Sequence, residues 1–273
     1  MSRVSTNRFT IRHLSTYEEY RLVGGIQKET WGEDPVEYLS PTLLAVTSKI
    51  GGIIAAAFSD EGEAIGFVYG LPGIREGVDI HWSHMLAVIP SWRGHGIGRA
   101  LKNFQKDFVR NQGIRRINWT YDPLEAVNAN LNVARLGAIP VEYACDLYGD
   151  GTFSKLSRLI GTDRLIVTWF LHDQDRQAFL SRYHQPPPVK NIKQVISKDL
   201  SFRNEVTEAP AIRIRVPANI QQMKAQDPDA AVAWRAATRL AFQHYFELDY
   251  TVYDIRLDSY TKEVDYILTA PIL

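Results

Sequence analysis

The stretch Arg93–Arg99 reads R-G-H-G-I-G-R and joins two segments with different hydrophobic periodicity. The preceding run M-L-A-V-I, residues 85–89, is continuously apolar, which favours a buried strand. After the stretch, apolar residues recur at spacings of three and four, which predicts an amphipathic helix. They are Ile97, Ala100, Leu101, Phe104 and Phe108. Because each glycine increases the entropy lost on folding, three glycines at one junction indicate a specific use.

This stretch is chemically suited to hold a phosphate or a diphosphate. The first amides of a helix have no acceptor within the helix, and glycine lets a ligand approach them closely. The helix dipole contributes about 0.3–1 kcal/mol toward a bound anion. Arg93 and Arg99 add full positive charges beside it. The spacing G-x-G-x-G fits neither the dinucleotide fingerprint G-x-G-x-x-G nor a P-loop, which needs Lys-Ser or Lys-Thr.

The pattern R-x-x-G-x-G, following a strand that ends in L-A-V-I-P, resembles the signature of the GNAT superfamily of N-acetyltransferases. That signature begins with Gln or Arg and ends in G-x-G or G-x-A, and Arg93, Gly96 and Gly98 match its fixed positions. The resemblance covers about Phe9 to Leu171. The runs S-H-M-L-A-V-I-P, W-T-Y-D-P-L and R-L-G-A are also similar to a bacterial subgroup of GNAT proteins.

The resemblance implies that acetyl-CoA, or another acyl-CoA such as succinyl-CoA, is the co-substrate, with no metal. Its diphosphate would be bound by the glycine stretch and the helix start, that is by Arg93, Gly94, His95, Gly96, Ile97, Gly98 and Arg99. The backbone of Leu86, Ala87 and Val88 would pair with the pantetheine arm as with a strand. Asn128 would bond to the pantetheine amides, with Asn130 and Asn132 as alternatives.

Acyl transfer to an amine needs a general base, donors for the oxyanion and a proton for the leaving thiolate. The resemblance implies a base on the strand before the glycines, and His84 is the candidate because its ordinary pKa lies near neutrality. The alternative is a histidine that is hydrogen-bonded inside the sheet. Strict alternation would place Trp82, His84 and Leu86 on one face, and His81, Ser83 and Met85 on the other. Glu142, on a later strand, is the second candidate for the base and a predicted substrate-binding residue, with an ordinary surface carboxylate as the alternative.

The proton donor for the thiolate departs from the family pattern. Many GNAT members carry a tyrosine four residues before the glycine that ends the second helix, and here that position is Val133, before Gly137. Tyr121, Tyr143, Tyr148 or water could take the role. The family recognises the acceptor with its first helices and their loop, here residues 26–40. Trp31 in that segment is either an apolar wall for a small amine or a core residue.

The order of predicted elements and the resemblance together imply an α/β (α+β) fold of GNAT type. We expect a mixed, mostly antiparallel central sheet flanked by helices, with a small α+β part after it. Two strand–helix–strand units predict a parallel pair in the middle of the sheet. Composition predicts a proline-rich linker over residues 184–192. The resemblance then implies an acyltransferase domain over 1–183, with an extension over 193–273.

Two local predictions concern element ends. Pro72 and Gly73 are expected to end the strand that starts near Ala64. The run D-P-L-E, residues 122–125, is typical of a helix start, with aspartate as the cap and proline in the first turn. The buried stripe of that helix would be Leu124, Val127, Leu131 and Ala134. Farther on, the pattern predicts strands at 211–216, 250–257 and 264–270 and a helix over 228–246.

Net charge and cysteine content narrow the classes of function that the sequence supports. The net charge is zero, which argues against a dedicated nucleic-acid binder. A single cysteine, Cys145, fits a reducing cytoplasm, and neither a signal-peptide core nor a run of membrane-spanning length is seen. We expect a cytoplasmic N-acyltransferase for a small-molecule amine such as an amino acid, with no nucleic-acid or membrane partner and with a homodimer suggested by the family. The alternatives are a non-catalytic CoA-binding regulatory module and an aminoacyl-tRNA-dependent transferase.

Overall fold

The computed structural model describes residues 9–32, 38–149, 159–188, 191–203 and 209–272. Their internal contacts group the chain into two compact units, Met1–Trp119 and Thr120–Leu273, here called the N-terminal and the C-terminal unit. Each is described by itself. The functional domain limits expected from composition stay a prediction, because compactness alone does not test them.

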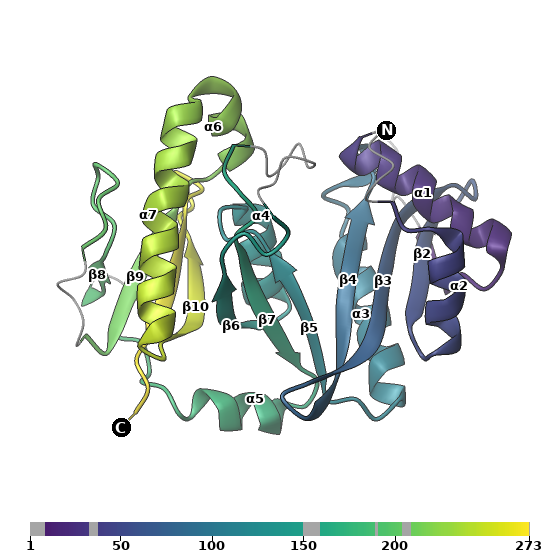
Figure 1. Ribbon diagram of the computed structural model, residues 1–273, viewed down its shortest axis with the longest axis horizontal. Helices are drawn as coiled ribbons and strands as arrows, with labels where there is room; N and C mark the ends of the chain where they lie inside the picture. The colour runs from purple at the N-terminus through teal and green to yellow at the C-terminus, as the bar shows by residue number, and fades with distance from the viewer. Residues whose placement is uncertain (1–8, 33–37, 150–158, 189–190, 204–208, 273) are drawn as a thin grey trace, which may run out of the picture. The chain divides into compact units, whose positions relative to one another are not determined.

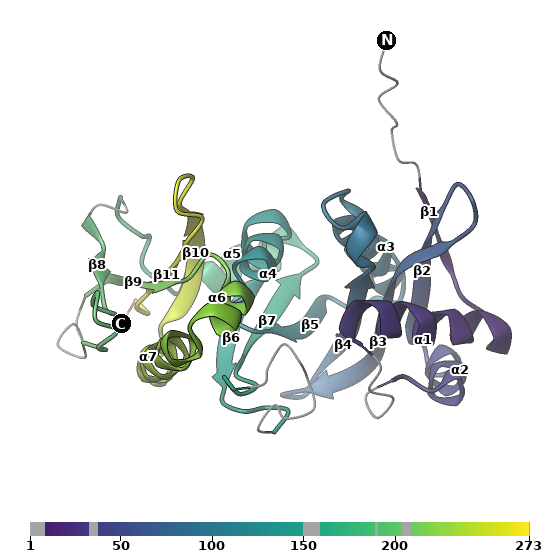
Figure 2. The same ribbon diagram turned by 90° about the horizontal axis from the view of Figure 1, so that it is seen from above.

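The N-terminal unit is built around a sheet with the strand order β1-β2-β3-β4-β5. Figure 1 labels β2 to β5, and Figure 2 also labels β1. Neighbouring strands run antiparallel except β4 and β5, which pair in parallel, so the expected parallel pair is confirmed. Its elements are β1 (Phe9–His13), α1 (Tyr17–Trp31), α2 (Pro41–Lys49), β2 (Ile53–Ser59), β3 (Ala64–Arg75), β4 (Val78–Val88), α3 (Ile97–Asn111) and β5 (Arg116–Tyr121), which continues into the C-terminal unit.

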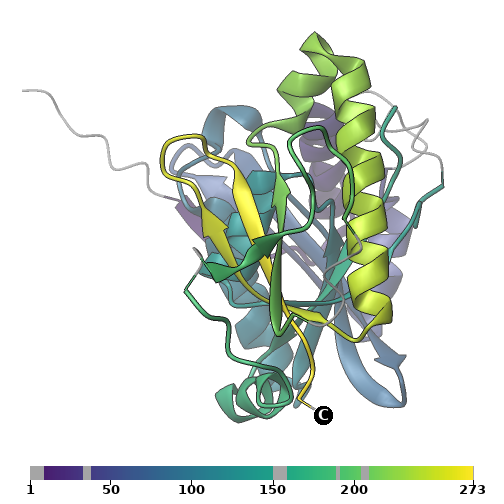
Figure 3. The ribbon, with the colours of Figure 1, turned by 90° about the vertical axis from the view of Figure 1, so that its left-hand side faces the viewer.

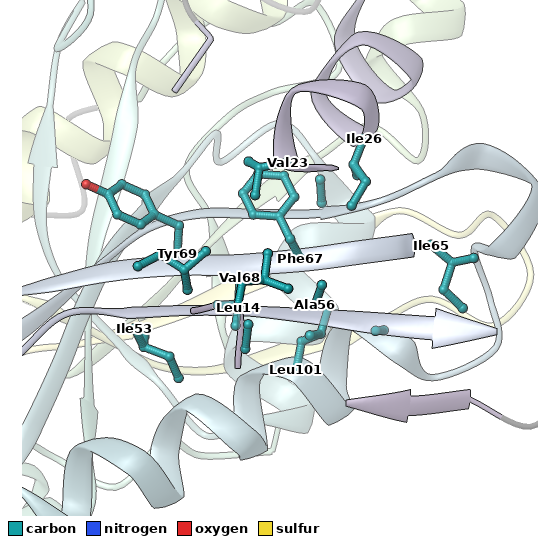
Figure 4. Packing of buried hydrophobic residues seen from close by; sticks show 14 of the residues in the cluster. Leu14, Val23, Ile26, Ile53, Ala56, Ile65, Phe67, Val68, Tyr69 and Leu101 are labelled. Atoms are coloured by element: carbon teal, nitrogen blue, oxygen red, sulfur yellow. The ribbon is translucent and has the colours of Figure 1, made fainter. Parts of the chain in front are cut away.

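Helices cover both faces of this sheet, with α1 and α2 on one side and α3 on the other (Figure 2). Figure 4 shows side chains of α1 and of α3 packed against those of the strands between them, among them Val23, Phe67 and Leu101. All seven residues of β2 are buried, as its continuous apolar run predicts. The start of α1 is fixed by a capping box, in which Thr16 and Glu19 satisfy each other's backbone amides.

Two features of this unit differ from the sequence-based expectation. The first is β3, which continues through Pro72 and Gly73 to Arg75. Its pairing with β2 ends at Gly70, so beyond that point β3 pairs with β4 on one side and a proline without an N–H is tolerated on the other. The second is α2, for which no range was predicted. Ser40 caps it and Pro41 occupies its first turn, a start signal present in the sequence.

The C-terminal unit contains the antiparallel pair β6 and β7 and a four-stranded sheet of order β10-β11-β9-β8. Helix α7 lies along this small sheet, as Figure 3 shows from the side of that sheet. The elements are α4 (Ala126–Ala129), a π-helical turn (Asn130–Arg135), β6 (Ile139–Ala144), β7 (Arg164–Phe170), α5 (Asp173–Leu180), β8 (Lys193–Gln194), β9 (Ala211–Val216), α6 (Ile220–Gln226), α7 (Pro228–Glu247), β10 (Thr251–Leu257) and β11 (Val264–Thr269). The expected strands and long helix of residues 211–270 are confirmed, whereas α5 and α6 were not anticipated.

The helix expected to start at Asp122 begins later and buries other residues. α4 starts at Ala126, and Asp122 instead accepts a hydrogen bond from the amide of Leu124 at 2.9 Å. The predicted stripe is wrong at Val127, which is 77% exposed, and at Ala134, which is also exposed. The π-helical turn widens the helix and shifts the following side chains around its axis. The buried positions are Ala126 and Ala129 before this turn, and Asn132, Val133 and Leu136 within and after it.

Among the described residues, no helix is both long enough and apolar enough to cross a membrane.

Candidate functional site

The glycine stretch forms an open turn that leads into α3. Gly94 and Gly96 have φ angles of +84° and +80°, a left-handed conformation that glycine adopts without strain. A Cβ built on either residue meets no heavy atom within 4 Å. Arg93, Gly94, His95, Gly96 and Arg99 are all exposed. The turn therefore presents its backbone to solvent and not to the protein interior.

The N-terminus of α3 has free amides beside this turn. The first backbone hydrogen bond of the helix runs from the amide of Ala100 to the carbonyl of Gly96, at 3.0 Å. The amides of Ile97, Gly98 and Arg99 precede that bond, so they have no acceptor within the helix. A Cβ on Gly98 would meet only ordinary contacts, 3.8 Å from a Leu86 methyl group. Packing alone therefore does not require glycine at position 98.

The side chains of the stretch are partly fixed by backbone carbonyls. Arg93 donates from Nε to the carbonyl of Val88 at 3.2 Å, which links the turn to the end of β4. His95 Nδ1 lies 3.2 Å from the carbonyl of Trp92, and the two rings are 5.9 Å apart. The exposed guanidinium groups of Arg93 and Arg99 place positive charge around the free amides. An anion at this turn would meet backbone donors and cations together.

Within the described residues, one edge of β4 has no ladder partner beside this turn. Its parallel ladder with β5 has two rungs, His81 with Ile117 and Trp82 with Asn118. On its other edge β4 pairs with β3 as far as Val88. Residues 83–88 therefore lie past the last rung with β5, and this segment includes the predicted Leu86, Ala87 and Val88. An extended amide-bearing ligand can pair with such an edge as an added strand.

A β-bulge at His84 interrupts the alternation of β4. The pairing with β3 passes from Gly70 with Ser83 directly to Tyr69 with Met85, so His84 is the extra residue. Ser83 contacts Lys102 of α3, whereas Met85, two residues on, accepts from Gln27 of α1 on the opposite face. Leu86 then lies near Gly98 of α3.

The two face assignments made from strict alternation are therefore wrong beyond the bulge. Met85 does not share the face of Ser83, and Leu86 does not lie opposite it. The alternation rule assumes one residue per rung, and the bulge adds a residue that no rung accommodates. The pairing of β4 with β3 determines where the bulge lies, so the sequence of β4 alone does not predict it.

His84 lies on the side of the sheet covered by α1 and α2. Its ring meets that of Tyr69 edge to face at 5.7 Å, and the Tyr69 hydroxyl is 3.1 Å from Thr47 Oγ1 of α2. The residue is exposed, yet the protein around its ring lowers the pKa of His84 from the ordinary value of 6.5 by desolvation. The imidazole is therefore neutral at pH 7 and able to accept a proton.

A buried polar cluster that the sequence analysis did not single out lies on the α3 face of the same strands. Lys102 is 2% exposed, and its Nζ donates to Ser83 Oγ at 2.8 Å and to Gln105 Oε1 at 3.4 Å. The same nitrogen lies 3.6 Å from the ring centroid of Trp119 on β5. Burial lowers the pKa of Lys102 well below 10.5.

His81 belongs to this cluster as well. The amide of Gln105 donates to His81 Nε2 at 3.2 Å. Burial and the neighbouring Lys102 lower the pKa of His81 to about 3, so its imidazole stays neutral. A signal was present in the sequence: Gln105 stands four residues from both Leu101 and Val109, and so on the buried stripe of α3.

The remaining predicted residues are distributed as follows. Trp31 ends α1 and meets Phe67 edge to face at 6.4 Å, a core contact. In the C-terminal unit Asn128 is exposed on α4, whereas Asn132 is buried. Glu142 is half-buried on β6.

Three tyrosines were considered as proton donors, and they differ in burial. Burial raises the pKa of Tyr121, and burial together with Asp163 raises that of Tyr143, whose hydroxyl donates to Asp163 at 2.5 Å. Tyr148 is exposed, with its hydroxyl 3.0 Å from Thr120 Oγ1. Val133, at the position of the family tyrosine, is buried. Among the described residues, no group of three or more His, Cys, Asp or Glu side chains could hold a metal ion.

The free amides, the open glycine turn and the free edge of β4 lie in a segment that matches the model of a known protein family. Residues 14–137 match the model of the acetyltransferase (GNAT) family. This segment is a GNAT acetyltransferase domain, and the mixed, mostly antiparallel sheet with flanking helices agrees with that fold. No curated protein matches the chain in sequence.

Solved structures of GNAT proteins are similar to the chain over about 60% of its length. The NatC complex bound to Gag peptide and CoA has 17% identity and a TM-score of 0.48, with 60% of this chain and 99% of that chain covered. The ribosomal-protein-S18-alanine N-acetyltransferase from Escherichia coli has 16% identity and a TM-score of 0.47, with coverages of 60% and 94%. The aminoglycoside 6'-acetyltransferase type Ii has 19% identity and a TM-score of 0.46, with coverages of 60% and 97%. These similarities assign no substrate to the GNAT domain.

Proposed function

We propose that the chain is an acyl-CoA-dependent N-acyltransferase that moves an acetyl group to the amine of a small molecule such as an amino acid. One observation carries the proposal: the free amides at the start of α3 lie next to the free edge of β4. A diphosphate with an amide-bearing arm is the ligand that uses both features at once, because the amides take the anion and the edge takes the arm. Coenzyme A has this composition.

In the proposed reaction the amine nitrogen attacks the carbonyl carbon of the thioester. His84 takes a proton from the amine, since its lowered pKa keeps the ring neutral at pH 7. A backbone amide of Leu86, Ala87 or Val88 donates to the developing oxyanion. The carbon–sulfur bond then breaks, and the thiolate takes up a proton. Water, one of the donors expected from the sequence, supplies that proton in the proposed reaction.

The acceptor is proposed to bind on the side of the sheet covered by α1 and α2. His84 faces the Tyr69 ring on that side, and the hydroxyls of Tyr69 and Thr47 bond to each other. Trp31 lies on the same helix pair, although its contact with Phe67 gives it a packing role already. We place the enzyme in the cytoplasm, because a single cysteine suits a reducing compartment.

A non-catalytic CoA-binding module is the second candidate function. It is favoured by Val133, which has no proton to donate and is buried in the π-helical turn. Such a module would bind CoA and respond to it without turning over an acceptor.

The experiment is a thermal-shift and calorimetric titration with CoA, acetyl-CoA, succinyl-CoA and NAD, followed by a transfer assay against an amine library. We expect CoA and acetyl-CoA to raise the melting temperature and NAD to leave it unchanged. Transfer to any small amine then supports the enzyme, whereas CoA binding without turnover favours the module. Folded protein that binds no CoA would overturn both.

A further inference from the structure

The turn between β5 and α4, residues 122–125, is held by three elements from the C-terminal third of the chain. Asp122 bonds to α7, the carbonyl of Pro123 bonds to β11, and Glu125 bonds to α6. All of these contacts lie within the C-terminal unit. The partners are between 96 and 143 residues apart in sequence. The turn therefore gains these contacts only when the C-terminal segment is present and folded. The elements are labelled in Figure 2.

The contact from α7 is a buried ion pair. Arg235 Nη2 lies 2.6 Å from Asp122 Oδ2, and its Nε donates to the carbonyl of Ile160 at 2.8 Å. Both side chains of the pair are at most 10% exposed, and each has a second, longer ion pair, Asp122 with Arg164 at 3.7 Å and Arg235 with Asp163 at 3.9 Å. The other oxygen of Asp122 accepts from the amide of Leu124, which fixes the shape of the turn. Arg235 therefore acts on the turn through Asp122.

The contacts from β11 and α6 hold the next residues. The hydroxyl of Tyr266, a fully buried residue, donates to the carbonyl of Pro123 at 2.8 Å. The amide of Gln221 donates to Glu125 Oε1 at 2.6 Å. Glu125 is the residue before α4 and makes no capping bond with its own side chain, because that side chain is directed to α6.

The contacts of Asp122 come before the helix. Asp122 accepts from Arg235 with one carboxylate oxygen and from the amide of Leu124, two residues on, with the other. α4 starts at Ala126, immediately after the last contact of the turn. Asn128, the predicted pantetheine contact, lies three residues beyond Glu125. The position of α4 is thus set by where the C-terminal segment holds the turn.

We propose that residues 211–272 act as a clamp on the β5–α4 turn, and that Arg235, Tyr266 and Gln221 are positioning residues for acyl-CoA binding through α4. The inference rests on the proposed function for its link to acyl-CoA, whereas the clamp itself is a property of the fold. The C-terminal segment is then a working part of the acyltransferase and not a separate module.

The test uses the full chain and the substitution Tyr266→Phe, which removes the hydroxyl bond to Pro123 and keeps the ring. Tyr250→Phe is the matched control. Its hydroxyl also donates to a backbone carbonyl, that of Ala209 at 2.5 Å, but this bond does not touch the turn. Hydrogen exchange of residues 122–136 and the dissociation constant of CoA are measured for both variants, with the melting temperature as the check on folding.

We expect Tyr266→Phe to speed exchange over residues 122–136 and to weaken CoA binding by about tenfold, the loss of one buried hydrogen bond. Tyr250→Phe should change neither. Equal exchange and equal affinity in the two variants would overturn the clamp. If the wild-type chain binds no CoA, the proposed function fails, and the exchange measurement still decides whether the turn is clamped.

A second pair of variants tests the clamp if Tyr266→Phe does not fold. Gln221→Leu removes the bond to Glu125 from a half-buried position on α6, where folding is less at risk. Gln222→Leu, on the exposed side of the same helix, is its control. Faster exchange at residues 122–136 in the first variant alone supports the clamp, and identical exchange in both contradicts it.

Discussion

The side-chain nitrogen of Lys102 lies 2.8 Å from the hydroxyl of Ser83, and both residues are buried between α3 and β4. No ion pair of Lys102 occurs within the described part of the chain, so a protonated amine here would be a buried charge without a counter-ion. Burial therefore favours the neutral amine, in agreement with the lowered pKa of Lys102. The cluster joins α3, which presents the free amides, to β4, which presents the free edge.

The first prediction concerns the pH dependence of stability. The pKa of Lys102 is lowered from 10.5 in the folded state, so between the lowered value and 10.5 the unfolded state binds one proton more. The free energy of unfolding should then rise by about 1.4 kcal/mol per pH unit across that window and become independent of this group below the lowered pKa, where Lys102 is protonated in both states. Denaturant unfolding between pH 7 and 9.5 measures it.

Lys102→Met should remove this slope while keeping a side chain of similar length over Trp119. Lys49→Met, at an exposed position of α2, is the matched control and should keep the slope. An identical pH dependence in wild type and Lys102→Met would show that Lys102 stays protonated in the folded protein.

The second prediction concerns the close approach of β3 to the polar cluster. A Cβ on Gly70 would lie 2.4 Å from His81 Nε2 and 2.7 Å from both Gln105 Nε2 and the carbonyl of Trp82. Gly70→Ala should therefore destabilise the protein by about 2–3 kcal/mol, because overpacking displaces the cluster beside the bulge. Gly73→Ala, farther along β3, is the control, since its nearest contact is 4.0 Å away. Equal unfolding free energies for the two variants would contradict the packing described.

The elements predicted well from the sequence are those whose pattern is decided locally. The apolar stripe of α3 carries its own periodicity, and Gly137 ends its helix with a φ angle of +72°. The glycine turn could also be predicted, because its function depends on backbone amides that no distant residue supplies.

The features missed are those that distant residues decide. The bulge at His84 follows from the pairing of β4 with β3, and the late start of α4 follows from contacts with Arg235 and Tyr266. In both cases tertiary contacts override the preference that the isolated segment would have. Lys102 was missed for a related reason, since a lysine on a helix is ordinarily taken to face solvent.

The third prediction tests the anion site at α3. Gly98→Glu should weaken CoA binding by at least about 100-fold, because the side chain fills the approach to the free amides and adds a like charge beside the diphosphate. Gly98→Ala is the control, since its Cβ meets only ordinary contacts and adds no charge. Calorimetric titration with CoA compares the two. If Gly98→Glu binds CoA with unchanged affinity, the diphosphate does not bind at this turn.

The fourth prediction tests His84 as the general base. Only the neutral imidazole accepts the proton, so kcat/KM should fall as the pH drops through the pKa of His84, which desolvation holds below 6.5. His84→Ala should flatten this acid limb and lower kcat by about 100-fold, with CoA affinity nearly unchanged. His184→Ala, an exposed histidine of the C-terminal unit, should keep both the limb and the rate. If kcat/KM of His84→Ala still falls at low pH, another residue is the titrating base. Glu142 would then be the next residue to replace.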